Sequence, residues 1–220
     1  MGDQVILLDL RRTKYVGIGG PHVAALAMVI DDWPIAGNDG SAGVDPARLS
    51  DSIVPLLRQH LLTDAAVPAL PKPRLAEPDE SLDAPDDCAR RGIEWRQLFR
   101  LWRASALSSR WLRHRNLSEI ALAVAQMRNG STAGGPTSEA QRRAVQAYMR
   151  ARPFAFTAHD RCLHDSLALV LFLAAERQFP RWVIGVRTRP FGAHSWVQSG
   201  RVVLNDLHEN VRGYCPILVV

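Results

Sequence analysis

Few residues in this chain point to disulfides, a membrane span or export. The sequence has three cysteines, Cys88, Cys162 and Cys215, and such a sparse, odd set does not favour a disulfide framework. The longest apolar run, 167–175, is too short to cross a bilayer and is typical of a core helix. The first residues lack the basic and then apolar pattern of a secretory signal. We therefore expect a cytoplasmic protein with no stable membrane insertion.

Metal and nucleotide motifs are absent from the sequence as well. It contains no Cys-x-x-Cys, His-Glu-x-x-His, Gly-x-Gly-x-x-Gly or Walker-type pattern. His164 follows Cys162 by two residues, a spacing that places the two side chains on different faces of a helix. We expect no metal site and no cofactor for the chemistry of the chain. Any nucleotide would be held by a partner or by a site that the sequence does not reveal.

Lysine is nearly missing from this basic chain. Of 27 basic residues only Lys14 and Lys72 are lysines, and 22 acidic residues leave a net charge of +5. The arginine bias can reflect genomic base composition; otherwise it favours an acidic peptide, an anionic membrane or a nucleotide as partner. Because the arginines are dispersed, the segment 67–89 is acidic and no recognition helix is apparent, the sequence does not favour nucleic-acid binding.

Arginines gather in the segment 90–115, where Trp95, Phe99 and Trp102 recur at helical spacing. This pattern predicts a basic amphipathic helix. We expect its aromatic stripe to pack in the core. Its basic face would be either solvated or a docking surface for a partner.

Hydrophobic patterning and composition divide the chain into three parts of an α+β protein. Residues 1–66 begin with two short strands joined at RRT, which predict a hairpin, and continue with helices at about 21–33 and 46–61. Residues 67–89 are dense in proline and acid, which predicts a linker. Residues 90–220 form the predicted second domain.

The chemistry is expected in the second domain, at Cys162, His194 and Asp206. Cys162 begins an apolar helix that Asp160 is placed to cap, His194 lies at the start of one strand, and Asp206 ends the next. A nucleophile, a base and an orienting carboxylate occur in this order in papain-like and transglutaminase-like enzymes. A helix N-terminus and a nearby imidazolium lower the pKa of a thiol, and unpaired N–H groups there can stabilise an oxyanion.

A turn at Ser199–Gly200 explains how His194 and Asp206 can meet, since antiparallel strands joined there bring the two side chains together. A different interpretation of the same residues is open. A cysteine at an apolar helix start is usually a small buried side chain, and a strand histidine is often a satisfied core group. The ordered set of Cys162, His194 and Asp206 is what favours catalysis.

The sequence around these residues resembles a known family. Residues 182–206, WVIGVRTRPFGAHSWVQSGRVVLND, are similar to the C-terminal signature of the lasso-peptide maturation proteases, the B proteins, and CLHDSLAL resembles their cysteine helix. The resemblance is specific over 160–206. It implies a transglutaminase-like cysteine protease with Cys162, His194 and Asp206 as its triad. Such a protease removes the leader from a ribosomally made precursor, and an asparagine-synthetase-like cyclase then closes the ring.

The first domain resembles the precursor-recognition elements of peptide-modifying systems, which are small sheets with helices of winged-helix type. The resemblance is carried by VILLDL-x₃-KYVGI followed directly by a helix. In such elements the leader adds as an extra strand. The resemblance implies a leader-binding strand of Lys14, Tyr15, Val16, Gly17 and Ile18. It also implies the precursor leader and a lasso cyclase as partners, and any nucleotide requirement would enter through the cyclase. A plain structural hairpin is the other interpretation.

Two other functions remain open on the sequence. An acyltransferase or transglutaminase would use the same triad, because a thioester does not fix whether water or an amine resolves it. A non-catalytic scaffold would bind the precursor leader and leave it unchanged.

Overall fold

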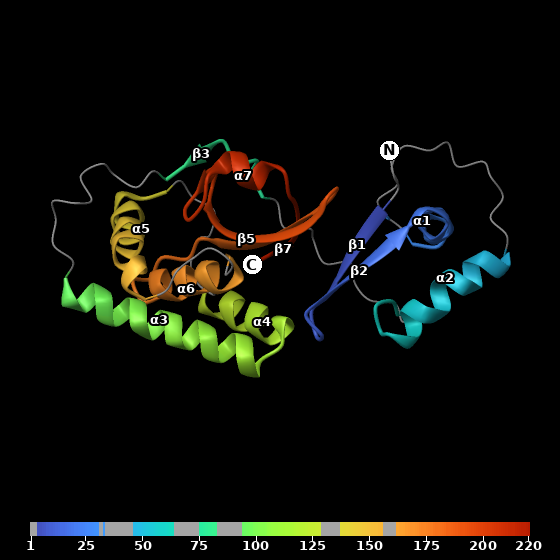
Figure 1. The fold of residues 1–220 in the computed structure, drawn as a ribbon, viewed down its shortest axis with the longest axis horizontal. Coiled ribbons are helices and arrows are strands. Elements are labelled where there is room, and N and C mark those ends of the chain that lie inside the picture. Colours follow the sequence, from blue (N-terminus) through green and yellow to red (C-terminus); the bar gives the residue numbers. More distant parts are fainter. Residues whose placement is uncertain are drawn as a thin grey trace. The chain divides into compact units, whose positions relative to one another are not determined.

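The computed structural model divides the chain into two units, Met1–Lys72 and Pro73–Val220 (Figure 1). The boundary between them lies inside the segment 67–89 that the sequence predicts as a linker. Each unit has a sheet of its own accompanied by helices, so the chain is an α+β protein. The structure describes residues 4–30, 33, 46–63, 75–82, 94–128, 137–155 and 162–220.

An antiparallel hairpin opens the first unit. Strand β1, Gln4–Asp9, pairs with strand β2, Lys14–Gly19. Asp9 shapes the turn, because its Oδ1 accepts hydrogen bonds from the backbone N–H groups of Arg11 and Arg12, at 2.9 and 3.0 Å. The predicted hairpin is confirmed, and a local side chain stabilises its turn.

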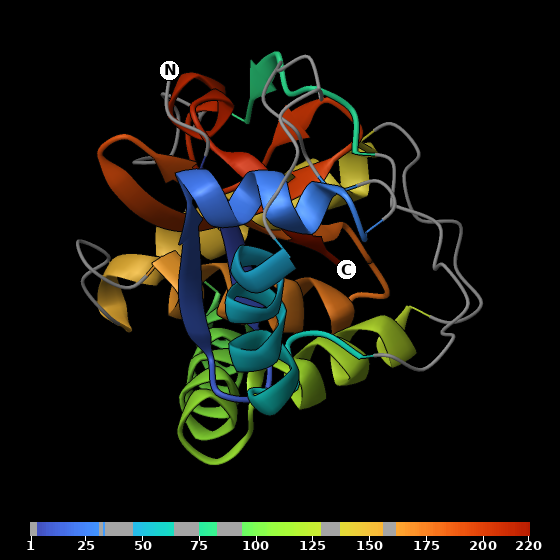
Figure 2. The same cartoon turned by 90° about the vertical axis from the view of Figure 1, so that its right-hand side faces the viewer.

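Two helices follow, α1 at Gly20–Ala27 and α2 at Pro46–Arg58. The first is shorter than the predicted 21–33, because the chain turns out of the helix after Ala27. Both helices lie on one side of the hairpin (Figure 1, Figure 2). The described part of this unit holds two strands and two helices, and its winged-helix type stays a prediction. The buried residues shared by hairpin and helices are Ile18, Val23, Leu26 and Leu56.

The second unit is organised on a five-stranded sheet with strand order β3-β6-β5-β4-β7. The β4–β5 hairpin forms its centre and places Gly185 opposite His194. All neighbouring strands are antiparallel except β3, which runs parallel to β6. The strands are β3, Glu80–Ser81; β4, Arg181–Thr188; β5, Phe191–Ser199; β6, Val202–Val203; and β7, Cys215–Val219.

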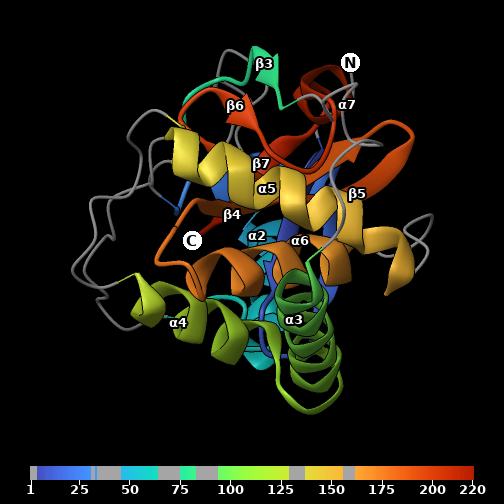
Figure 3. The same cartoon turned by 90° about the vertical axis from the view of Figure 1, so that its left-hand side faces the viewer.

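Helix α6 is the central helix of this unit. Every residue from His164 to Leu173 is buried. The sheet packs against one side of α6, and helices α3 and α5 pack against its other sides (Figure 1, Figure 3). The helices are α3, Trp95–His114; α4, Leu117–Met127; α5, Glu139–Ala151; the 3₁₀ turn η2, Arg152–Phe154; α6, Cys162–Ala174; and α7, His208–Arg212.

Residues 75–82, which the sequence assigns to the linker, instead form an edge of this sheet. Strand β3 pairs with β6, Leu75 packs against the core cluster around Trp196, and the Asp79 carboxylate pairs with Arg201 at 2.6 Å. Proline and acidic residues are typical of linkers. In this segment, however, Asp79 forms an ion pair with Arg201 of the second unit, and Leu75 packs against the core of that unit. The second unit therefore begins before residue 90.

The aromatic stripe of α3 does not pack in the core, contrary to our expectation. Trp95, Phe99 and Trp102 are 71%, 62% and 63% exposed. The helix has a second apolar face, and only one face can pack against α6. The residues of α3 that are buried instead are Leu101, Ala104, Ser108 and Trp111.

Candidate active site

Cys162 is the first residue of α6 and is half-buried. Because the body of α6 is enclosed by the core, the sulfur lies on a helix that cannot shift without disturbing that core. The expected helix start at Cys162 is confirmed. Asp160, which we expected to cap the helix, lies outside the described residues.

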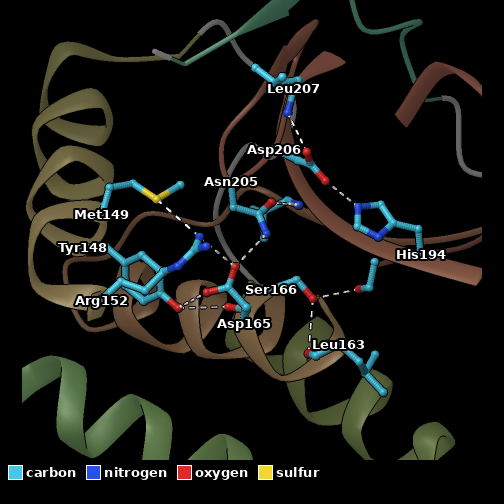
Figure 4. Close-up of polar contacts among 12 residues, drawn as sticks. Tyr148, Met149, Arg152, Leu163, Asp165, Ser166, His194, Asn205, Asp206 and Leu207 are labelled. Atoms are coloured by element: carbon cyan, nitrogen blue, oxygen red, sulfur yellow. Dashed lines mark hydrogen bonds and ion pairs between the residues drawn. The ribbon is translucent and has the colours of Figure 1, made fainter. Parts of the chain in front are cut away.

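His194 and Asp206 meet across the β5–β6 connection. Ser199 pairs with Val202, and Gly200 has a φ of 58°, which places the tight turn where the sequence predicts it. His194 Nε2 lies 2.6 Å from Asp206 Oδ2 (Figure 4). This contact occupies one imidazole nitrogen and leaves Nδ1 for the thiol.

The ionisation of Cys162, His194 and Asp206 is coupled. The hydrogen bond with His194 is the largest influence on Cys162 and lowers the pKa of its thiol, although partial burial acts to raise it. The hydrogen bond with Asp206, followed by the one with Cys162, raises the pKa of His194 from 6.5 to about 9. These opposite shifts favour a thiolate beside an imidazolium, which is the reactive form of a cysteine nucleophile.

Asp206 is held in its charged form. Burial acts to raise the pKa of its carboxyl, but hydrogen bonds from His194, the Asn210 amide and the Leu207 N–H lower it overall. Asn210 Nδ2 and Leu207 N lie 2.9 and 2.7 Å from Oδ1, while Oδ2 faces the imidazole. The carboxylate is therefore fixed on both oxygens.

A buried carboxylate in the first turn of α6 connects the parts of the site. Asp165 accepts a hydrogen bond from Tyr148 Oη at 2.8 Å and pairs with Arg152 at 3.2 Å. Asn205, the residue before Asp206, donates its amide to the same carboxylate at 3.4 Å (Figure 4). The network joins α5, α6 and the segment that carries Asp206.

Two serines fasten α6 to β5 next to His194. The hydroxyls of Ser166 and Ser195 lie 2.7 Å apart, and the indole N–H of Trp182 donates to Ser166 Oγ at 3.0 Å. All three side chains are buried. The strand that carries His194 is thus bonded to the helix that carries Cys162.

Four further residues of the site are not predicted from the sequence: Asp165, Ser166, Ser195 and Asn205. A signal for the first two is present, because polar residues interrupt an otherwise apolar helix at 162–174. Nothing in the sequence alone pairs Asp165 with Asn205, since the two are 40 residues apart.

The predicted leader-binding residues, Lys14 to Ile18, lie on β2 of the first unit. Ile18 is buried, Val16 is half-buried, and Lys14, Tyr15 and Gly17 are exposed. We expected Tyr15 or Val16 to line a groove against the helix at 46–61. A hollow of about 460 Å³ lies at the C-terminal end of α2, but neither Tyr15 nor Val16 is among its described lining residues. Its lining residues are Arg11, Leu57, His60, Leu62 and Thr63.

The described residues show neither a metal cluster nor a membrane span. In those ranges no three His, Cys, Asp or Glu side chains are placed to hold a metal ion. None of the helices described there is both long and apolar enough to cross a bilayer.

Known proteins resemble parts of the chain. A family model described as the Transglutaminase-like superfamily matches residues 88–219, more than half of the chain. The Microcin J25-processing protein McjB of Escherichia coli is 49% identical over 45 residues, which are 20% of this chain and 22% of McjB. The chain thus spans about a fifth of the length of the curated relative it matches. No solved structure matches the chain.

Proposed function

Because this chain belongs to the transglutaminase-like superfamily, we propose that it is a cysteine peptidase with Cys162, His194 and Asp206 as its triad. The observation that carries the proposal is the contact of 2.6 Å between His194 Nε2 and Asp206 Oδ2, together with the lowered pKa of the Cys162 thiol, whose largest cause is His194. A nucleophile, a base that lowers the pKa of that nucleophile and a carboxylate that orients the base are the groups that covalent acyl chemistry needs.

In this mechanism the Cys162 thiolate attacks the carbonyl carbon of the scissile peptide bond and forms a C–S bond. Unpaired N–H groups at the start of α6 are suited to stabilise the oxyanion that develops. His194 gives its proton to the leaving amine as the C–N bond breaks, and a thioester remains on the sulfur. Water, deprotonated by His194, then releases the acid product and restores the thiolate–imidazolium pair.

We further propose that the substrate is a ribosomally made lasso-peptide precursor, from which the chain removes the leader. The support is the similarity to McjB, a protein named for processing microcin J25, and the resemblance of residues 182–206 to the B proteins. A partner cyclase would then close the ring. Any nucleotide requirement would belong to that partner.

The first unit is proposed to bind the leader. Within its described residues β2 pairs only with β1, so the other edge of β2 carries no strand there. An extended leader would add along Lys14–Ile18 through backbone hydrogen bonds. Because both units belong to one chain, a weakly held leader would still present its scissile bond to the triad at high effective concentration.

Cleavage of the precursor peptide encoded beside this gene, followed by mass spectrometry, tests the function. Cys162→Ala should abolish leader removal, with a loss of about 10³-fold or more, and should leave the fold intact because it only shortens a small side chain. Cys215→Ala removes an exposed free thiol and is the matched control, with the wild-type rate expected.

Two outcomes would contradict this assignment. Cleavage by Cys162→Ala at the wild-type rate would exclude the triad. Transfer of the acyl group to an added amine, with no hydrolysis, would identify the acyltransferase alternative.

A further inference from the structure

Two aromatic rings flank the His194 imidazole. Its centroid lies 6.2 Å from that of Trp196 and 5.3 Å from that of Tyr214. On the neighbouring strand Gly185 lies opposite His194, and a Cβ there would come within 2.8 Å of the Trp196 ring and 3.0 Å of Tyr214 Cβ. Since side-chain carbons do not approach so closely, Gly185 makes room for the Trp196 ring and for the Tyr214 Cβ beside the imidazole.

Arg187 holds the Tyr214 ring from another side. Its guanidinium carbon lies 5.2 Å from the ring centroid, a cation–π contact. Arg187 lies opposite Gly192 in the β4–β5 hairpin, and a Cβ on Gly192 would meet the Arg187 Nε at 2.9 Å. The second glycine therefore leaves space for the guanidinium over the ring. His194, Tyr214 and Arg187 form a row that we call the Tyr214 stack.

The base of Tyr214 is anchored in the core. The residue packs against a buried cluster that includes Val183 and Val211, and its N–H donates to Val211 O at 3.0 Å. A ring that is fixed at its base and clamped by Arg187 cannot turn aside with the imidazole. It can therefore limit how far His194 rotates.

We propose that Tyr214, pinned by Arg187, is a positioning residue that holds the His194 imidazole between Cys162 and Asp206. The inference rests on the proposed triad. An imidazole bonded only through its nitrogens can still swing about its side-chain bonds, and a ring against it removes that freedom. The electron-rich ring also favours the imidazolium over the neutral imidazole.

The charged and titratable groups around His194 come from different elements. Asp206 after β6 is hydrogen-bonded to it, and Cys162 on α6 raises its pKa. Tyr214 contacts it from the turn before β7, and Arg187 on β4 lies over the Tyr214 ring. Loss of the Arg187 charge would by itself change the electrostatic field around the imidazole. An experiment must therefore separate the charge of Arg187 from its contact with the ring.

Alkylation of the full chain by iodoacetamide as a function of pH tests the Tyr214 stack without a peptide substrate. In a Cys88→Ala, Cys215→Ala background Cys162 is the thiol that remains to react. Tyr214→Leu should lower the alkylation rate near neutral pH on the order of tenfold and move the midpoint to higher pH. Tyr214→Phe keeps the ring and should keep the wild-type profile.

Three variants on the β4–β5 hairpin serve as comparison. Arg187→Met should lower the rate about two- to fivefold, and because Arg187 is exposed the fold should survive. Gly192→Ala keeps the charge but forces the Arg187 side chain to shift, because the added Cβ would lie 2.9 Å from its Nε, so it should lower the rate in the same direction as Arg187→Met. Arg189→Met removes another exposed arginine of the same hairpin and should change nothing.

An unchanged profile in a folded Tyr214→Leu protein would overturn the proposal. So would equal losses in Arg187→Met and Arg189→Met, because these would reflect charge alone. If Tyr214→Leu does not fold, Gly192→Ala and Arg187→Met decide the question. The proposed function fails separately: wild-type protein that cleaves no precursor would refute it, whereas the alkylation profiles would still test the stack.

Discussion

At the scale of single residues, the opposite pKa shifts of Cys162 and His194 define the pH range of the reaction. The pair is reactive where the thiol has lost its proton and the imidazole still holds one. That range runs from the lowered pKa of Cys162 to about 9, the raised pKa of His194. Initial rates of precursor cleavage should rise through the first value and fall above the second, because His194 then has no proton for the leaving amine.

Asp206→Asn should move the upper limit of this range downward. An amide accepts the His194 hydrogen bond without a negative charge, so the pKa of His194 falls from about 9 towards 6.5. The rate near neutral pH should drop, though less than in Cys162→Ala or His194→Ala. Asn210→Ala keeps the Asp206 charge and is the control, with a much smaller shift expected. An upper limit unchanged in Asp206→Asn would exclude the orienting role of the carboxylate.

The buried Asp165 carboxylate should matter for stability as well as geometry. Asp165→Asn leaves the Arg152 guanidinium without its anion, since the Asp165 side chain is only 6% exposed. We expect the free energy of unfolding to fall by about 2–4 kcal/mol in urea denaturation. Glu139→Gln breaks the exposed Glu139–Arg143 pair and should cost less than about 0.5 kcal/mol. Equal costs for both variants would contradict a structural role for Asp165.

At the scale of elements, the proposed leader-binding edge of β2 makes a prediction about backbone bonds. In strand addition alternate residues of the leader turn their N–H groups towards β2 and the others towards solvent. N-methylation along a labelled leader should therefore weaken binding to the full chain at every second position, as measured by fluorescence polarisation. Val16→Pro removes a backbone donor from β2 and should also weaken binding, while alkylation of Cys162 stays unchanged. If N-methylation weakened binding at positions that do not alternate along the leader, recognition through side chains would explain the binding better.

The sequence predicts well those elements whose shape depends on residues within the element itself. The β1–β2 hairpin turns on the Asp9 side chain, and the β5–β6 turn needs the φ of 58° at Gly200. In contrast, periodicity alone does not tell which face of α3 is buried, because the helix has two apolar faces and α6 covers the one around Leu101. Which face packs depends on neighbours that are distant in sequence.

At the scale of the whole molecule, the second unit includes residues that composition assigns to a linker. The buried Gln198 side chain donates to Ala76 O at 2.7 Å, and Ser81 Oγ lies 2.9 Å from His208 Nδ1. A shortened chain of residues 73–220 should unfold cooperatively. A chain of residues 90–220 should melt at a lower temperature, because the Gln198 amide keeps its bond to Gly200 O but loses the one to Ala76 O, and β6 loses β3. Equal thermal midpoints would show that the segment 75–82 adds no stability.

Some residues of the candidate site could be predicted from their order in the sequence, whereas others are brought to the site only by the fold. Cys162, His194 and Asp206 could be proposed from residue type and chain order, because a helix start and a strand turn are local features. The contact between Tyr214 and His194 could not be predicted in this way. It depends on the space beside Gly185 and on the turn before β7, which brings Tyr214 next to the imidazole. Sequence therefore points to the reacting groups, whereas the groups that align them appear only in the fold.

The distribution of tryptophan over the chain gives the site an optical signal. Trp95 and Trp102 on α3 are exposed, whereas Trp111 on the same helix and Trp182 and Trp196 in the sheet are buried. An aqueous quencher such as iodide therefore removes the emission of the exposed pair and spares that of the buried tryptophans. The Trp196 ring is stacked near His194, whose charge changes at about pH 9. A change near pH 9 in the emission that survives the quencher thus reports the protonation of His194 with no label and no substrate.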